Sequence, residues 1–217
     1  VLQIRETAND TFIGSAYDFR VYSDPNHMRD EIFRLNQVNN KARLLAGYCW
    51  NWKKEGKNNS NIHDIELMDH DFSMSWNLGN SDSWAIDSDS VNEIGCIHTS
   101  QGLEFDYVGV IIGDDLYAED NEVKTDYTKR AKTDSSLKGI KKMAKEDPDK
   151  AFKLADEIIR NTYRTLLTRG QKGCFVYCTN KQLETYLKDR LNLIVKSYEP
   201  NEFFRADAIV AEDRGEY

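Results

Sequence analysis

The stretch "IHTSQGLEFDYVGVIIG", residues 97–113, places polar groups that suit a nucleotide between apolar residues typical of buried strands. Gly102 has no Cβ, so the backbone there can approach a phosphate closely. Gln101 offers an amide, and Glu104 offers a carboxylate that could accept hydrogen bonds from ribose hydroxyls. From these residue types alone, a polar turn between two strands is an equally good interpretation, so a second signal is needed.

The segment "NTYRTLLTRGQKG", residues 161–173, supplies that second signal. Arg169 stands where a predicted helix ends, and its planar, permanently charged guanidinium suits a phosphate group. Arg160 and Arg164 are four residues apart and therefore lie on one face of the same helix. For these two arginines an ordinary surface role is as good an interpretation as phosphate binding.

Strands and helices alternate along the chain, and this pattern predicts a parallel α/β sheet that would position both segments. Near-continuous apolar runs predict buried strands, and apolar residues three or four apart predict helices. The predicted strands cover residues 18–23, 42–50 and 173–179, and helices are predicted from residue 25 and after Pro148. Because ligands gather at the carboxyl ends of parallel strands, we expect "HTSQG" to lie at such an end.

Two regions interrupt this alternation. Residues 51–92 contain turn residues and partial apolar alternation, which predicts an inserted β-hairpin or small lobe. Residues 116–136 form a long polar excursion, for which we expect a partial hairpin. A solvated face or a groove for a nucleic-acid backbone would explain the basic side of the short helix that follows. That side carries four lysines, Lys138, Lys141, Lys142 and Lys145.

The composition limits the class of protein. The 217 residues fit one domain, and the net charge of −8 has the wrong sign for a protein coated in nucleic-acid-binding surface. Any such contact must therefore be confined to one face. No basic and apolar signal-like segment opens the sequence, so we expect no signal peptide, and no apolar run is long enough to span a membrane. Its four cysteines lack a C-x-x-C pair and its histidines are scattered, so we expect reduced thiols, no metal site and a cytoplasmic location.

The two polar segments resemble known helicase motifs. "IHTSQGLEFDYVGVIIG" resembles motif V of superfamily 1 helicases, and "YRTLLTRG" resembles their motif VI with its L-T-R core. Together with "ARLLAGYCW", the spacing is most similar to the Schlafen-type (group 3) DNA/RNA helicase domain, over residues 18–180. The resemblance implies that residues 1–217 form a second RecA-like domain, an α/β fold whose parallel sheet is flanked by helices, with residues 51–92 as an inserted β-hairpin lobe.

The same resemblance implies a role for each matching nucleotide-site residue. Gly102 and Glu104 match the residues that meet the phosphates and the ribose in motif V, and Gln101 occupies the Lys/Gln position beside them. Arg169 matches the catalytic motif VI arginine, an arginine finger that reaches the γ-phosphate. Arg164 falls where many relatives have Tyr, so it is assigned only a phosphate-binding or structural role.

Partners and cofactors also follow from the resemblance. His98 and Thr99 match motif V positions near the nucleic-acid strand, which makes single-stranded DNA or RNA an expected partner. A complete motor needs the phosphate loop G-x-x-x-x-G-K-[ST], and the sequence contains none. ATP, with Mg²⁺ bound mainly by a P-loop domain upstream in the same protein, is therefore the expected cofactor. The chain alone is expected to be inactive, while its parent should be an ATPase with no membrane partner.

A metal-dependent nuclease is the main alternative. Asp114 and Asp115 follow a predicted strand, and Glu122 and Lys124 have the E-x-K spacing that such enzymes use. The carboxylates would hold Mg²⁺, and the lysine would orient a water molecule.

A non-catalytic interaction module is a further alternative. In that interpretation the nucleotide edge has decayed, and the four tryptophans form a surface for a partner. These residues are Trp50, Trp52, Trp76 and Trp84.

Overall fold

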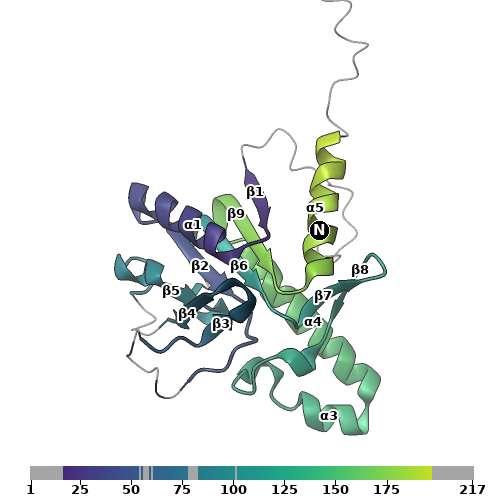
Figure 1. The fold of residues 1–217 in the computed structure, drawn as a ribbon. Coiled ribbons are helices and arrows are strands. Elements are labelled where there is room, and N and C mark those ends of the chain that lie inside the picture. Colours follow the sequence, from purple (N-terminus) through teal and green to yellow (C-terminus); the bar gives the residue numbers. More distant parts are fainter. Residues whose placement is uncertain are drawn as a thin grey trace, which may run out of the picture.

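The computed structural model describes residues 17–53, 55, 59, 61–77, 83–100 and 102–196, with side chains up to residue 191. A seven-stranded sheet runs through the molecule in the order β1-β9-β6-β2-β5-β4-β3, and every neighbouring pair is parallel except β3 and β4 (Figure 1). In that order the strands are Asp18–Tyr22, Gly170–Cys178, Phe105–Ile112, Ala42–Ala46, Glu93–Gly95, Phe72–Trp76 and Ile65–Leu67. The predicted α/β class with a parallel sheet is confirmed.

The central strands are buried on both faces because alternate residues serve two different cores. In β6, Val108 and Val110 pack with residues of α4 and α5, whereas Ile111 packs against the α1 side. The helices are α1 (Pro25–Asn39), α2 (Ile97–Ser100), α3 (Ile140–Glu146), α4 (Pro148–Leu167) and α5 (Lys181–Lys196). Helices therefore cover both faces of the sheet, as the near-continuous apolar strand sequences require.

Polar side chains fix where the long helices begin. Asp24, Asp147 and Asn180 accept hydrogen bonds from backbone N–H groups in the first turns of α1, α4 and α5, at 2.8, 3.0 and 2.8 Å. These caps satisfy donors that have no partner inside the helix. The predicted helix starts at residue 25 and after Pro148 are confirmed.

The hairpin predicted within residues 51–92 is present as β3 and β4. It continues the main sheet, because β4 pairs in parallel with β5. A second, separate hairpin consists of β7 (Leu116–Glu119) and β8 (Glu122–Thr125). Asp120 and Asn121 form its tip with φ of 52° and 61°, a conformation that Asp and Asn tolerate better than most residues.

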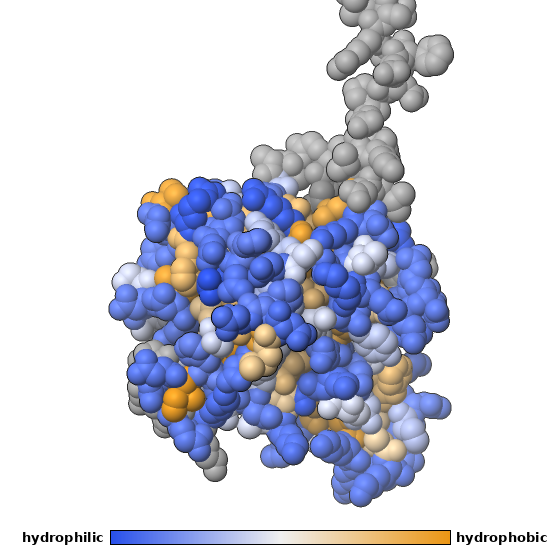
Figure 2. Space-filling model, viewed as in Figure 1, coloured by the Kyte–Doolittle hydropathy of each residue, from blue (hydrophilic) through white to orange (hydrophobic). Residues whose placement is uncertain are grey.

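Short single-turn helices connect several of these elements. They are η2 (Met68–His70), η3 (Asp89–Asn92), η4 (Tyr127–Lys129) and η5 (Ser135–Leu137). The face of the molecule seen in Figure 2 is mainly hydrophilic, with apolar residues in small separate patches. Among the described residues, no helix combines the length and apolar character that crossing a membrane would need.

One strand prediction needs correction. The run 42–50 forms a strand only as far as Ala46, and turn residues follow at Tyr48 and Cys49. At Gly47, just past the strand, a Cβ atom would lie 2.0 Å from the hydroxyl oxygen of Tyr163. The polar stretch follows the carboxyl end of β5, as predicted, and folds into the helical turn α2, which begins at Ile97. The hydroxyl groups of Thr99 and Ser100 stabilise that turn by donating to the carbonyl oxygen of Cys96, at 3.1 and 3.0 Å.

Candidate functional site

The two helicase-like segments meet where β6 and β9 begin. The N–H of Phe105 donates to the carbonyl oxygen of Arg169 at 2.9 Å, and Phe105 pairs with Gly170. Gly102 and Glu104 precede β6 and therefore lie beside Arg169. This junction is the amino edge of the sheet. The prediction that all of "HTSQG" lies at a carboxyl end was therefore wrong for its last residue, since α2 crosses from the end of β5 towards the start of β6.

Arg169 is held in place by backbone groups alone. Its Nε donates to the carbonyl oxygen of Thr165 at 3.1 Å, and its Nη1 donates to that of Leu103 at 3.4 Å. Within the described part of the chain, the half-buried guanidinium has no carboxylate partner, and Nη2 makes no hydrogen bond. In a chain of net charge −8, a fixed cation whose charge no neighbour cancels is suited to an anionic ligand.

Glu104 and Gly102 lie on the exposed side of the same edge. The side-chain amide of Gln171, on β9, donates to the carboxylate of Glu104 and so orients it. Gly102 has a φ of 76°, which favours glycine, and a Cβ added there would have nothing within 4 Å. The backbone around Gly102 is therefore open to a ligand. Gln171 was not predicted from the sequence, because nothing in its local pattern places it opposite Glu104.

The two other arginines of α4 differ from each other. Arg160 is structural, since its Nε donates to Asp156 at 2.9 Å and its Nη2 donates to the carbonyl oxygen of Val123 at 2.7 Å. Arg164 is exposed, and among the described residues its side chain has no ion pair. The hydroxyl of Thr168 donates to the carbonyl oxygen of Arg164 at 2.9 Å, which closes the last turn of the helix before Arg169.

The positions matched to nucleic-acid contacts lie near the carboxyl end of β5. His98 is exposed on α2, whereas Thr99 is only 4% exposed. The hydroxyl oxygen of Thr99 accepts from the N–H of Cys96 at 2.8 Å, so this side chain points inward. Thr99 therefore fixes the turn that presents His98. Gln101 lies outside the described residues.

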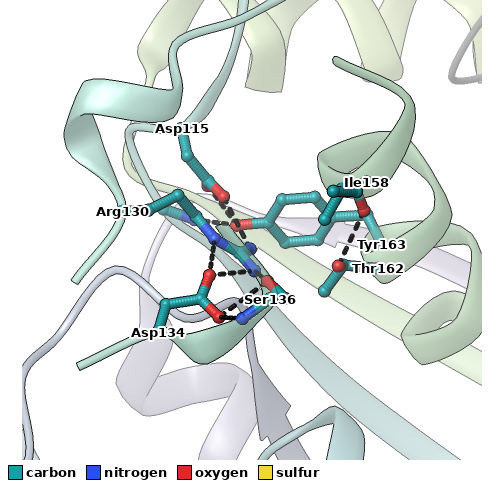
Figure 3. A network of polar contacts seen from close by, with 8 residues as sticks. Asp115, Arg130, Asp134, Ser136, Ile158, Thr162 and Tyr163 are labelled. Carbon is teal, nitrogen blue, oxygen red and sulfur yellow. Dashed lines mark hydrogen bonds and ion pairs between the residues drawn. The ribbon is translucent and has the colours of Figure 1, made fainter. Parts of the chain in front are cut away.

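A buried ionic network occupies the opposite, carboxyl edge (Figure 3). Arg130 donates to Asp115 at 3.0 Å and pairs with Asp134 at 2.7 Å, and all three side chains are at most 3% exposed. Tyr163, on α4, donates its hydroxyl to Asp115 at 2.5 Å and accepts from the N–H of Gly113 at 3.0 Å. Burial disfavours the charged form of Arg130, but the two carboxylates outweigh this and raise its pKa. Burial, together with the charge of Asp115, raises the pKa of Tyr163 well above its usual value.

This network contradicts the nuclease interpretation. Asp115 is fully buried, and both its carboxylate oxygens are engaged, by Arg130 and Tyr163. Asp114 instead accepts from the hydroxyl of Thr179 at 2.6 Å. Glu122 and Lys124 lie on β8, where Lys124 pairs with Glu119 at 2.7 Å. Among the described residues, no cluster of three or more His, Cys, Asp or Glu could hold a metal ion.

The tryptophans do not form one common surface. Trp76 and Trp84 are 0% and 3% exposed and belong to different hydrophobic cores. Trp52 is half-buried and stacks on Trp76, with ring centroids 5.9 Å apart. Trp50 is half-buried and packs against the same core as Trp76. The interaction-module interpretation needs these indoles at the surface, and it is weakened because Trp76 and Trp84 are buried in the cores.

Residues 1–180 match the family described as "Schlafen group 3, DNA/RNA helicase domain", which confirms the predicted resemblance to that family. The chain is also similar to a protein of Saccharomyces cerevisiae (strain ATCC 204508 / S288c) named "Uncharacterized protein YPL245W", with 27% identity over 176 residues. That alignment covers 79% of this chain and 36% of the yeast protein, so the chain spans about a third of its relative's length. No solved structure matches the chain.

Proposed function

Because this chain belongs to the Schlafen group 3 DNA/RNA helicase domain family, we propose that it is the second RecA-like half of a superfamily 1-type ATP-dependent helicase or nucleic-acid-stimulated ATPase. The first RecA-like domain, with the phosphate loop, would belong to the same parent protein. The chain would supply an arginine finger and ribose contacts to an ATP site that the other domain completes.

The observation that carries this proposal is the state of Arg169. Its guanidinium is fixed by two backbone carbonyl groups, at 3.1 and 3.4 Å, and no carboxylate of the described residues neutralises it. A cation held in advance at the place where negative charge develops stabilises a phosphoryl-transfer transition state without further reorganisation. Arg43, a structural arginine that also lacks a carboxylate partner among the described residues, is by contrast fully buried and has all three guanidinium nitrogens hydrogen-bonded.

The residues around Arg169 fit a nucleotide. Glu104 is exposed and oriented by Gln171, so its carboxylate could accept from ribose hydroxyls. The backbone at Gly102 is open, which suits the close approach of a phosphate. Gln101 and Arg164 are assigned supporting phosphate contacts. ATP would supply the phosphoryl group, and the P-loop domain would hold most of the Mg²⁺ coordination. His98, presented by the turn that Thr99 stabilises, would face the nucleic-acid strand.

ATP turnover by the full-length parent protein tests the proposal. Arg169→Ala should lower turnover about a thousandfold or more, because arginine fingers contribute that much in related NTPases. Nucleotide affinity and thermal unfolding should stay near wild type. Arg34→Ala is the matched control, because Arg34 is an exposed arginine on α1 paired with Glu31 at 2.8 Å, and its turnover should not change.

Two further results would count against the proposal. Wild-type turnover in the Arg169→Ala variant would mean that the segment resembling motif VI keeps its shape but has no role in ATP hydrolysis. Substantial turnover by residues 1–217 alone would also contradict it, because the chain lacks a phosphate loop.

A further inference from the structure

A groove of about 770 Å³ lies at the carboxyl edge of the sheet, on the opposite edge from Arg169. One wall is the segment 127–141, from η4 to the first turn of α3, and the other wall includes Cys49 and Asn51, which follow β2. Four lysines line it, and we refer to it as the lysine groove: Lys129, Lys132, Lys138 and Lys141. The sequence pattern predicted a basic side for α3, but not that two lysines of the preceding loop share a groove with it.

The charge of the lysine groove is not cancelled by the protein. All four lysines are exposed, and among the described residues none of them pairs with a carboxylate. The acidic residue that lines the groove is Asp134, whose carboxylate is taken by Arg130 at 2.7 Å. By contrast, Lys124 and Lys172 each pair with a carboxylate at 2.7 Å. The groove therefore concentrates positive charge on one face of an acidic protein, as a localised polyanion site requires.

The walls of the lysine groove are fixed before any ligand arrives. The N–H of Ala131 donates to the carbonyl oxygen of Tyr48 at 2.8 Å, and that of Lys132 donates to the side chain of Asn51 at 2.9 Å. Arg130 anchors the segment 127–141 to the protein interior through its ion pairs with Asp115 and Asp134. A loop tied at consecutive residues loses little conformational freedom on binding, which favours affinity.

The lining also contains surface that suits unpaired bases. Tyr127 lines the groove and is half-buried, and its neighbours there include hydroxyl and amide side chains such as Thr128, Thr133 and Asn51. Aromatic rings that stack on bases, beside lysines that contact phosphates, are the usual components of single-strand binding sites. Tyr127 also packs against two hydrophobic cores, so only part of its ring faces the groove. A duplex hides its bases and could not stack on that part.

We infer that the lysine groove binds the phosphate backbone of a single-stranded nucleic acid, at a site separate from the Arg169 edge. This inference rests on the proposed function, which it deepens by assigning the nucleic acid a surface beyond His98. The two edges are about 25 Å apart along β6, from the rise of about 3.3 Å per residue in a strand. The nucleic acid would therefore bind in the lysine groove without contacting the ATP at the Arg169 edge.

The test is fluorescence anisotropy of a labelled oligothymidine of about 20 nucleotides with the full-length protein, across a range of salt concentrations. The groove variant carries Lys129→Gln, Lys132→Gln, Lys138→Gln and Lys141→Gln. Its affinity should fall tenfold or more, and its slope of log K against log salt should flatten by about 2 to 3, since each single-strand phosphate contact contributes about 0.7. Unlabelled duplex should compete poorly.

A control variant removes the same charge from the neighbouring surface. It carries Lys142→Gln, Lys145→Gln, Lys150→Gln and Lys153→Gln, which are exposed lysines outside the groove, and its affinity should change less than about threefold. Equal weakening in both variants would overturn the inference, because only net charge would then matter. Wild-type binding by the groove variant, or equal competition by duplex, would overturn it as well.

ATP turnover without nucleic acid separates this inference from the proposed function. The groove variant should keep wild-type basal turnover, because none of its substitutions lies at the Arg169 edge. If the wild-type protein did not hydrolyse ATP at all, the proposed function would fail while the binding comparison still decided the groove. If basal turnover were normal and the two lysine variants bound alike, only the groove inference would fail.

Discussion

Arg130 and Arg169 are the same residue type at opposite edges of one sheet, and their surroundings differ in almost every respect. The side chain of Arg130 is 2% exposed and bound to two carboxylates at 3.0 and 2.7 Å. Arg169 is half-buried and bound only to backbone carbonyl groups. α4 connects the two edges, since Tyr163 contacts the Arg130 network and Arg169 follows the end of the helix.

The comparison shows how to separate structural from functional charge in this protein. A buried cation whose partners neutralise it holds elements together and has nothing left for a ligand. A cation that is positioned but not neutralised keeps its field available to whatever binds.

Arg130→Met should lower the free energy of unfolding by about 3–5 kcal/mol, because it leaves two buried carboxylates without a counter-charge. Arg169→Met should change that free energy by less than about 1 kcal/mol, since its half-buried guanidinium has no charged partner to lose in the described part of the chain. Urea unfolding of both variants measures the difference. Similar losses of unfolding free energy in the two variants would contradict this difference, because Arg169 would then have a structural role as well.

Tyr163→Phe should lower the free energy of unfolding by about 1–3 kcal/mol, since it removes a hydrogen bond to buried Asp115 and leaves the N–H of Gly113 without its acceptor. Tyr117→Phe is a control, because Tyr117 is half-buried on the separate hairpin. Thermal unfolding followed by circular dichroism would measure the stability of both variants. A Tyr163→Phe variant as stable as wild type would mean that the network does not anchor α4.

Glu104→Gln should weaken ATP binding about fivefold to tenfold, as expected for losing one charge-assisted hydrogen bond to a ribose hydroxyl. Asp106→Asn is the matched control two residues away, because the carboxylate of Asp106 is already bound by Lys172 and Asn39 at 2.7 Å each. Titration of the full-length protein with a fluorescent ATP analogue gives both affinities. Equal weakening of ATP binding by the two substitutions would contradict the assignment of Glu104 to the ribose.

Glu184 gives a smaller, pH-dependent effect. Burial by itself would raise its pKa, but hydrogen bonds from Lys181, Lys188 and Ser23 outweigh burial and lower the pKa to about 2. Its contribution to stability is therefore fully present above the usual value of 4.5 and is lost as the pH falls towards 2. The stability difference between wild type and Glu184→Gln should shrink as the pH is lowered through this range. A difference that does not depend on pH would contradict the shift.

Sequence pattern was sufficient for the alternating elements of the sheet. Apolar periodicity and the prolines Pro25 and Pro148 are local signals, and they predicted the helix starts correctly. The strand ends were harder, since β2 stops just before Gly47, which packs against Tyr163 from a helix far along the chain. No local pattern contains that information.

The candidate site was also only partly predictable. The motif resemblance selected Arg169, Gly102 and Glu104, but not the edge of the sheet where they meet. The apparent metal ligand Asp115 was misleading, because its partner Arg130 comes from a loop whose path depends on tertiary contacts. Whether a charged residue is neutralised is a property of the fold, so residue type and spacing alone could not distinguish the two edges.

The absence of one methyl group sets how closely α4 can approach the sheet. At Gly47, a Cβ atom would lie 2.0 Å from the hydroxyl oxygen of Tyr163, and at Gly113 it would lie 2.4 Å from the sulfur of Cys49. Any other residue at position 47 must push Tyr163, and the helix that carries it, away from β2. Arg169 follows the end of this helix, so its position would change with the size of the residue at position 47. Gly47, at the carboxyl edge of the sheet, would thus determine how far an arginine at the amino edge can extend.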